Sequence, residues 1–355
     1  MKPLPKKILI VRLGALGDVV NALVLANAIK RAAPETFIGW AVHNLAYPIV
    51  DGNPAVDRAH LWDKKLGARG ILACVREVRE EGYDLAIDLA RIFKSAAVAR
   101  LSGAPRVLGF DKKRTKEYAG LFLKERIPGC KQTLSPVHMV EQYMEFASYL
   151  GIEGAPKHSL PANDSAELWA EAQIKVLGDA PIAIGIGASY ESKRWPAARF
   201  LELARRASDK LGRPVILLGG PGDREMSADE LDELASEGRA GIVDYVGKTS
   251  LAELIAITGK ASVFVSCDTG PMHLAVAKGR RVVALFGPGV AGRTGPYNPE
   301  LPDGAGRRHE IISVPPECAP CNKRTCSMDR HHCMLDIGVE LVLAAVERQL
   351  ARACE

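Results

Sequence analysis

The segment from Cys267 to Pro288 (CDTGPMHLAVAKGRRVVALFGP) has the residue types of an anion-binding site at the start of a helix. A β-branched and aromatic run over residues 261–266 comes before it and predicts a buried strand. Asp268 or Thr269 can cap the helix that follows, and Gly270 leaves room for a ligand near its first turn. Unpaired backbone N–H groups and the positive end of the helix dipole favour a phosphate there.

A second candidate site is the turn LGALGDVV, which follows the strand-like run KKILIVR. Its glycines, Gly17 among them, let a substrate approach the backbone, and ligands of open α/β sheets bind at the ends of strands. Asp18 stands at or near the start of the next helix. Because an aspartate is also a common helix cap, its position alone leaves a structural and a catalytic role open.

Two more turns carry polar residues that could bind a ligand. In GIGASYESKRWP, a turn of small residues contains Ser189 and leads to Lys193, although a lysine in a loop is usually only solvated. In VILLGGPGDRE, a glycine-rich turn leads to Asp223. Asp223 can cap a helix or bind a ribose, and one role does not exclude the other.

These segments together resemble the bacterial ADP-heptose:lipopolysaccharide heptosyltransferases, glycosyltransferase family 9. The family's Asp-(Thr/Ser)-Gly-x-x-His run is matched by Asp268, Thr269, Gly270 and His273. The similarity continues, in the family's order and spacing, through KILIVRLGALGDVVNALVLANAIK, YDLAIDLARIFKSA, KRWPAARF and VALFGP. The resemblance implies that the matched run contacts the pyrophosphate of a nucleotide sugar.

The resemblance also implies roles for single side chains. Asp18 would be the general base that deprotonates an acceptor hydroxyl, with inversion at the anomeric carbon. Ser189 and Lys193 would contact the donor phosphates, and Asp223 the ribose. The charge on the leaving diphosphate would be stabilised by Lys193 and a helix N-terminus, so no cofactor or metal is expected for catalysis.

The length and the segment pattern predict two α/β domains. A chain of 355 residues exceeds one typical core, and both halves alternate strand-like and helix-like segments, as in parallel sheets with helices on both faces. The resemblance implies the GT-B fold, two Rossmann-like domains facing across a cleft. We expect an acceptor domain over residues 1–165, a donor domain over 166–337, and a helix over 338–355 that packs back on the first domain.

The sequence also predicts where the main elements lie. Strands are expected over 8–12, 37–42, 85–89, 107–110, 182–186, 215–218, 263–266 and 281–286. Helices include 20–32 and 197–211.

Positive charge is concentrated in the first half of the chain. Residues 1–165 hold 24 Lys and Arg against 17 Asp and Glu, a net charge of +7. Because the whole chain has a net charge of +5, residues 166–355 carry −2. A solvated basic face would explain this, whereas a nucleic-acid partner is disfavoured because aromatic residues are not interleaved. An anionic lipid-linked glycan fits better, and we expect Gly17, Lys94 and Lys116 among its contacts.

The composition predicts a cytoplasmic protein, and the expected lipid-linked acceptor implies peripheral contact at the inner face of the membrane. Hydrophobic residues make up 47% and charged residues 25% of the chain. No apolar run reaches the roughly 18 to 20 residues that span a bilayer, and the start of the chain lacks the pattern of a secretory signal.

Four cysteines cluster near the C-terminus: Cys318, Cys321, Cys326 and Cys333. One C-x-x-C pair followed by two looser cysteines is compatible with a structural zinc site or with reduced thiols. A cytosolic location argues against disulfides.

Two other functions are compatible with parts of the pattern. One is a non-catalytic nucleotide-binding or scaffold protein, and the other a glycosyltransferase that uses another nucleotide sugar and another envelope glycan. The presence of both Asp18 and Lys193 favours an enzyme. An oxidoreductase is disfavoured because LGALGD lacks the G-x-G-x-x-G spacing.

Overall fold

The computed structural model describes residues 3–129, 136–299, 308–328 and 330–352. The chain forms two compact units, Met1–Ala162 and Asn163–Glu355. The boundary lies a few residues before the expected one at 165. Hydrogen bonds tie the connecting segment to the first unit, since the Ser159 hydroxyl donates to Asn53 Oδ1 at 3.0 Å and accepts from Asn27 Nδ2 at 2.7 Å.

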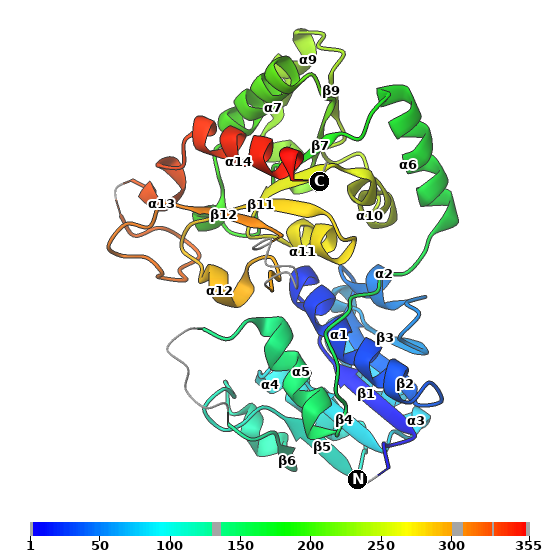
Figure 1. Cartoon of the computed structure of the whole chain (residues 1–355). Helices are drawn as coiled ribbons and strands as arrows, with labels where there is room; N and C mark the ends of the chain where they lie inside the picture. Colours follow the sequence, from blue (N-terminus) through cyan, green and yellow to red (C-terminus); the bar gives the residue numbers. More distant parts are fainter. Residues whose placement is uncertain (1–2, 130–135, 300–307, 329, 353–355) are drawn as a thin grey trace. The chain divides into compact units, whose positions relative to one another are not determined.

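The first unit contains a six-stranded parallel sheet in the order β3-β2-β1-β4-β5-β6 (Figure 1). Its strands are β1 (Lys7–Val11), β2 (Phe37–His43), β3 (Arg58–Trp62), β4 (Leu85–Asp88), β5 (Arg106–Gly109) and β6 (Glu125–Arg126). Its helices are α1 (Leu16–Ala32), α2 (Tyr47–Val50), α3 (Ala68–Glu81), α4 (Phe93–Leu101) and α5 (Met139–Tyr149), with 3-10 turns η1 (Lys64–Leu66) and η2 (Ala119–Phe122).

The second unit contains another six-stranded parallel sheet, in the order β12-β11-β10-β7-β8-β9. Its strands are β7 (Ile182–Gly185), β8 (Val215–Leu218), β9 (Ile242–Asp244), β10 (Val263–Cys267), β11 (Arg281–Phe286) and β12 (Glu310–Ser313). Its helices are α6 (Asp164–Leu177), α7 (Ala197–Leu211), α8 (Pro221–Met226), α9 (Ala228–Ser236), α10 (Leu251–Lys260), α11 (Gly270–Ala277), α12 (Ala291–Thr294), α13 (His332–Leu335) and α14 (Val339–Ala351), with the 3-10 turn η3 (Glu191–Lys193).

Both sheets have the same topology. Counted from the first strand of each unit, the order is 3-2-1-4-5-6, which is the doubly wound Rossmann order. The order reverses between β1 and β4 in the first unit and between β7 and β10 in the second. Ligands of such sheets bind beyond the carboxyl ends of the strands at this reversal, so it marks where each site is expected.

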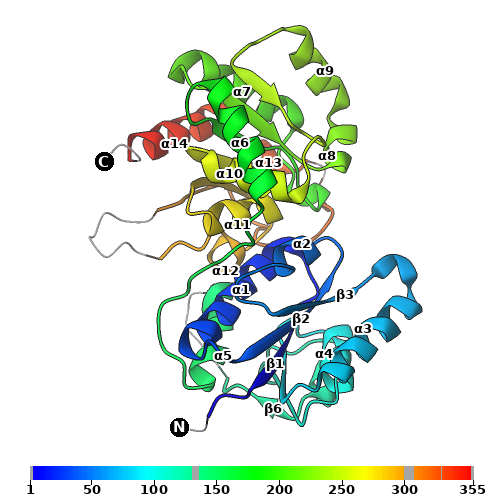
Figure 2. The same ribbon diagram turned by 90° about the vertical axis from the view of Figure 1, so that its right-hand side faces the viewer.

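Helices cover both faces of each sheet because the central strands are apolar on both sides. In the first unit, α1 and α5 pack together on one face and α3 and α4 cover the other (Figure 2). In the second unit, α7, α9 and α14 share one core with the sheet, and α6, α10 and α11 share the other.

The C-terminal helix belongs to the second unit. Helix α14 packs there on α7 and on β10, β11 and β12. Its residues Val339, Val342, Leu343 and Val346 recur at helical spacing and are buried. The second sheet provides the apolar face that covers this stripe. The expected packing of this helix on the first domain stays a prediction.

Within the described residues, no helix combines the length and the hydropathy that crossing a membrane requires.

Candidate active site

Asp18 lies in the first turn of α1, where its carboxylate forms an ion pair with Arg12. Arg12 directly follows β1 and is only 7% exposed. Its Nη1 also donates to the carbonyl of Leu89 at 3.3 Å, which links the ends of β1 and β4. Burial lowers the pKa of Arg12, but the carboxylates of Asp18 and Asp88 and the Tyr143 hydroxyl together raise it more, so the guanidinium stays charged. Arg12 therefore fixes the orientation of a carboxylate that remains 35% exposed.

Asp88 ends β4 and is buried on the opposite side of the strand reversal. Burial raises the pKa of this carboxyl to about 6, although bonds from Ser95 and from the backbone N–H groups of Ala90 and Arg91 lower it. The N–H of Ala90 donates to Asp88 Oδ1 at 3.0 Å. Asp88 thus shapes the turn that leads into α4, where Arg91 has a φ of 67°.

Positively charged side chains surround this edge of the first sheet. Lys94 is exposed in the first turn of α4, and the exposed Lys116 is held close by, since its backbone N–H donates to the Arg91 carbonyl at 2.8 Å. Burial lowers the pKa of His43 at the end of β2, and the charges of Lys64 and Lys94 lower it further, against a bond to the Trp62 carbonyl. Gly17 is buried within α1, beside Asp18.

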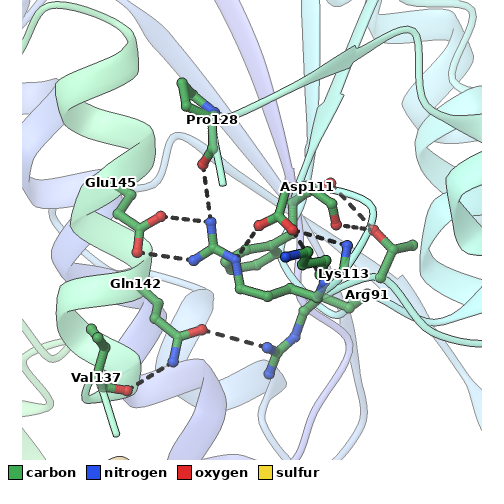
Figure 3. Close-up of polar contacts among 10 residues, drawn as sticks. Arg91, Asp111, Lys113, Pro128, Val137, Gln142 and Glu145 are labelled. Carbon is green, nitrogen blue, oxygen red and sulfur yellow. Dashed lines mark hydrogen bonds and ion pairs between the residues drawn. The ribbon is translucent and has the colours of Figure 1, made fainter. Parts of the chain in front are cut away.

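Not every cation of this edge is available to a ligand. Arg114 contacts the carboxylate of Asp111 and donates to Glu145 Oε1 at 2.9 Å, so its charge is balanced. The guanidinium of Arg91 lies 5.0 Å from the Phe110 ring centroid, and its Nη1 is 3.5 Å from Gln142 Oε1 (Figure 3). These contacts join the loops that follow β4 and β5 to helix α5.

In the second unit, Lys193 and Asp268 form an ion pair with an Nζ–Oδ2 distance of 2.5 Å. Lys193 ends η3 in the loop after β7, and Asp268 follows β10, so the pair spans the strand reversal. The Asp268 side chain is 9% exposed and that of Lys193 24%. A cation and a carboxylate are thereby held beside the start of α11.

Helix α11 begins as the sequence predicts, with one difference. Thr269 occupies the N-cap, but its hydroxyl makes no capping bond and lies 3.0 Å from Ser266 Oγ. Gly270 opens the helix and the buried His273 lies in its first turn. The Thr269 side chain therefore does not cap the N-terminus of α11. An anion site at a helix N-terminus requires this, because a capping side chain would occupy the N–H groups that bind the anion.

Asp223 and Ser189 lie near the same strand ends. The Asp223 carboxylate accepts from the N–H of Gly220 at 2.8 Å and caps α8. It also packs on Gly187, where an added Cβ would come within 2.2 Å of it. Gly187 thus has to be glycine for Asp223 to reach the end of β7. Ser189 is exposed in the next turn.

The segment that carries the cysteines supports the loop of Lys193. The buried Ser192 donates its hydroxyl hydrogen to the Lys323 carbonyl at 2.6 Å, and its N–H donates to the Arg324 carbonyl at 3.3 Å. The Arg324 guanidinium lies 4.9 Å from the centroid of the Tyr190 ring. The position of Lys193 therefore depends on a segment more than a hundred residues further along the chain.

The four cysteines, all of them described, are free thiols. Burial and the neighbouring Cys326, Cys321 and Cys318 raise the pKa of Cys333 to about 11. In the described part of the chain, no three His, Cys, Asp or Glu side chains are grouped so as to hold a metal ion. The structural zinc site considered from the spacing is therefore not supported.

Each unit thus carries its predicted residues in the segments that follow its central strands. Gly17, Asp18, Lys94 and Lys116 follow β1, β4 and β5, whereas Ser189, Lys193, Asp223, Asp268, Thr269, Gly270 and His273 follow β7, β8 and β10. Sequence reasoning missed Arg12 and Asp88. The only signal for either was a charged residue directly after an apolar strand run.

Comparison with known proteins decides the family. The family model for glycosyltransferase family 9 (heptosyltransferase) matches residues 71–332, most of the chain. The chain belongs to this family. It is 28% identical over 295 residues to lipopolysaccharide core heptosyltransferase OpsX of Haemophilus influenzae, covering 83% of this chain and 82% of that protein.

Solved structures of this glycosyltransferase family agree with the fold. E. coli ADP-heptose lps heptosyltransferase II has a TM-score of 0.76 at 23% identity, covering 98% of this chain and 100% of that chain. E. coli heptosyltransferase WaaC with ADP has a TM-score of 0.73 at 22% identity, covering 97% and 99%. The chain is thus a family 9 glycosyltransferase. Its two parallel sheets with helices on both faces form the expected GT-B fold.

Proposed function

We propose that this family 9 glycosyltransferase moves a heptose from ADP-heptose to an inner-core lipopolysaccharide acceptor, with inversion and without a metal ion. The observation that carries the proposal is the pair of charged sites at equivalent strand reversals, Asp18 with Arg12 and Lys193 with Asp268. The names of the relatives support heptose as the sugar and ADP as the nucleotide.

In this proposal Asp18 accepts the proton of an acceptor hydroxyl while that oxygen forms a bond to the anomeric carbon. The bond from the anomeric carbon to the phosphate oxygen breaks, and the diphosphate leaves with the electron pair. Attack opposite the leaving group inverts the anomeric centre. Arg12 keeps the Asp18 carboxylate in one orientation, which general-base catalysis requires.

The leaving diphosphate gains charge near Lys193 and the start of α11. Preorganised cations and backbone N–H groups stabilise such charge without reorganisation. Lys193 would exchange its partner Asp268 for a phosphate oxygen when the donor binds. Ser189 would add a hydroxyl to the phosphates, and Asp223 would accept from the ribose.

The acceptor is proposed to bind the first unit through Gly17, Lys94 and Lys116. Its phosphates and carboxylates match the positive charges of this edge, two of which, Lys64 and Lys94, add to burial in lowering the pKa of His43. Such an acceptor would place the protein at the cytoplasmic face of the membrane.

A transfer assay with purified protein tests the proposal. The donors are ADP-heptose, UDP-glucose and GDP-mannose, and the acceptor is heptose-deficient lipopolysaccharide. We expect ADP-heptose alone to give product, NMR to show inverted anomeric configuration, and EDTA to leave the rate unchanged. Transfer from another donor would contradict ADP-heptose as the substrate, and retained configuration would contradict inversion. A rate that EDTA abolishes and that Mg²⁺ or Mn²⁺ restores would contradict metal-independent transfer.

A further inference from the structure

The segment that carries the cysteines also carries an arginine beside the loop of Lys193. The guanidinium of Arg324 lies 4.9 Å from the centroid of the Tyr190 ring, and Lys193 Nζ lies 5.7 Å from the same centroid. Guanidinium and ammonium groups are attracted to the faces of aromatic rings at such distances. Tyr190 therefore brings a second cation close to the lysine that is proposed to contact the donor phosphates.

The backbone around Arg324 is held in place by hydrogen bonds. The N–H of Ser192 donates to the Arg324 carbonyl at 3.3 Å, and the Ser192 hydroxyl donates to the Lys323 carbonyl at 2.6 Å. The N–H of Asn322 donates to the carbonyl of Pro288 at 2.9 Å, so the segment is also joined to the turn that follows β11. The Arg324 side chain thus starts from a fixed point beside η3.

No carboxylate balances the charge of Arg324 within the described part of the chain. Arg324 is exposed, and it forms no ion pair there, although the exposed Glu191 is the residue after Tyr190. Lys193, in contrast, is paired with Asp268, and this pair has no net charge. A diphosphate carries negative charge on each phosphate, so it needs a cation in addition to this pair. Arg324 supplies one.

Other cations near these strand ends are engaged. Arg224 and Lys248 both form ion pairs with Asp244, and Arg194 donates to the Ala188 carbonyl at 3.2 Å. The guanidinium that lies on the Tyr190 ring differs from these cations, since it donates no hydrogen bond to another described residue. Its N–H groups can therefore bind the oxygens of a ligand.

We propose that Arg324 binds the diphosphate of the nucleotide-sugar donor from its position on the Tyr190 ring. A guanidinium suits this position, because its N–H groups form paired bonds to phosphate oxygens while its face stacks on an aromatic ring. The proposal rests on the proposed function, which supplies the diphosphate. Residues 316–326 then take part in donor binding through their backbone and through Arg324.

Calorimetric titration of the full-length protein with ADP tests the proposal. Arg324→Gln should raise the Kd for ADP about tenfold and weaken its dependence on salt. Arg324→Lys keeps the charge but loses the paired bonds, so its Kd should lie between those of the wild type and Arg324→Gln. The matched control is Arg330→Gln, which removes an exposed arginine that pairs with Asp336 at 3.6 Å. An unchanged Kd in Arg324→Gln, or an equal rise in the control, would overturn the proposal.

Adenosine and a second substitution test the contact itself. Adenosine has no phosphate, so saturation-transfer NMR should give it the same Kd in the wild type and in Arg324→Gln. A rise for adenosine as large as that for ADP would overturn a contact with the diphosphate. Tyr190→Leu removes the ring, so Arg324→Gln should raise the Kd for ADP less in that background than in the wild type. An equal rise in both backgrounds would overturn the role of Tyr190.

The nucleotide separates this proposal from the proposed function. Wild-type protein that binds UDP but not ADP would contradict the proposed donor alone, and the same variants titrated with UDP would then decide the role of Arg324. Wild-type protein that binds ADP no better than Arg324→Gln does would overturn the role of Arg324 alone.

Discussion

At the scale of single residues, the first unit places two carboxylates in contrasting surroundings. Asp18 is partly exposed and paired with Arg12, whereas Asp88 is buried and its pKa is raised to about 6. A carboxylate that must take a proton from a substrate has to be accessible and ionised. This contrast favours Asp18 as the base and gives Asp88 a structural task in the turn before α4.

Asp18→Asn should therefore abolish most turnover and leave the donor site intact. The amide keeps the shape of the side chain but cannot accept the proton, so kcat should fall by about 100-fold or more. Calorimetric titration with ADP should give an unchanged Kd, because the donor residues belong to the other unit. A kcat near that of the wild type would remove Asp18 from the mechanism.

Asp88 should make stability depend on pH. The unfolded carboxyl loses its proton near its ordinary value of about 4, whereas the folded one keeps it to about 6. The folded state binds more protons in between, so the free energy of unfolding falls as the pH rises through this window. Asp88→Asn does not titrate and should gain about 3 kcal/mol relative to the wild type between pH 4 and pH 7. Urea unfolding at several pH values measures this difference, and a constant difference would contradict the assignment.

At the scale of elements, the loop that carries Lys193 is positioned by a distant segment. Ser192→Ala removes the hydroxyl that donates to the Lys323 carbonyl. A single hydrogen bond contributes about 1 kcal/mol, so the Kd for ADP should rise about fivefold with a smaller change in kcat. The control is Ser236→Ala, which removes a similar bond to the Glu233 carbonyl on α9. Equal effects of the two changes would show that the Ser192 bond has no specific role.

The central elements could be predicted from the sequence and the edge strands could not. The strands expected over 215–218 and 281–286 match β8 and β11, and helix 197–211 matches α7, because continuous apolar runs and strict helical spacing mark them. No prediction was made for β3, β6, β9 or β12. β3 has an exposed arginine at its start, and β6 contains only Glu125 and Arg126. Edge strands are half solvated and short, so the apolar signal is lost.

Only part of the candidate site could be predicted from the sequence, because some of its residues have no local signal. The turns after β1, β7, β8 and β10 carry local signals of glycine, proline and acidic residues. The pairing of β1 with β4 brings Asp88 near Arg12, although the two residues are far apart in the chain. A strand pairing of this kind has no local pattern, so the link from Arg12 to the end of β4 emerged from the fold alone.

At the scale of the whole molecule, charge differs between the units. The first carries the surplus of cations, and Lys94→Ala with Lys116→Ala should raise the acceptor KM about tenfold and weaken its dependence on salt. Donor KM should not change. Lys175→Ala, an exposed lysine of the second unit, is the control. A parallel rise in donor KM would show that the two lysines do not act on the acceptor alone.

The position of α14 has a consequence for how the molecule melts. Helix α14 belongs to the core of the second unit, and the chain passes from one compact unit to the other only once. Each unit has a buried apolar cluster of its own. Calorimetry should therefore resolve two unfolding transitions. Saturating ADP should bind the donor unit and raise the midpoint of one of the two transitions. At a hundred times its Kd, ADP adds about 2.7 kcal/mol to the stability of that unit. A single transition that ADP shifts as a whole would show that the two cores unfold together.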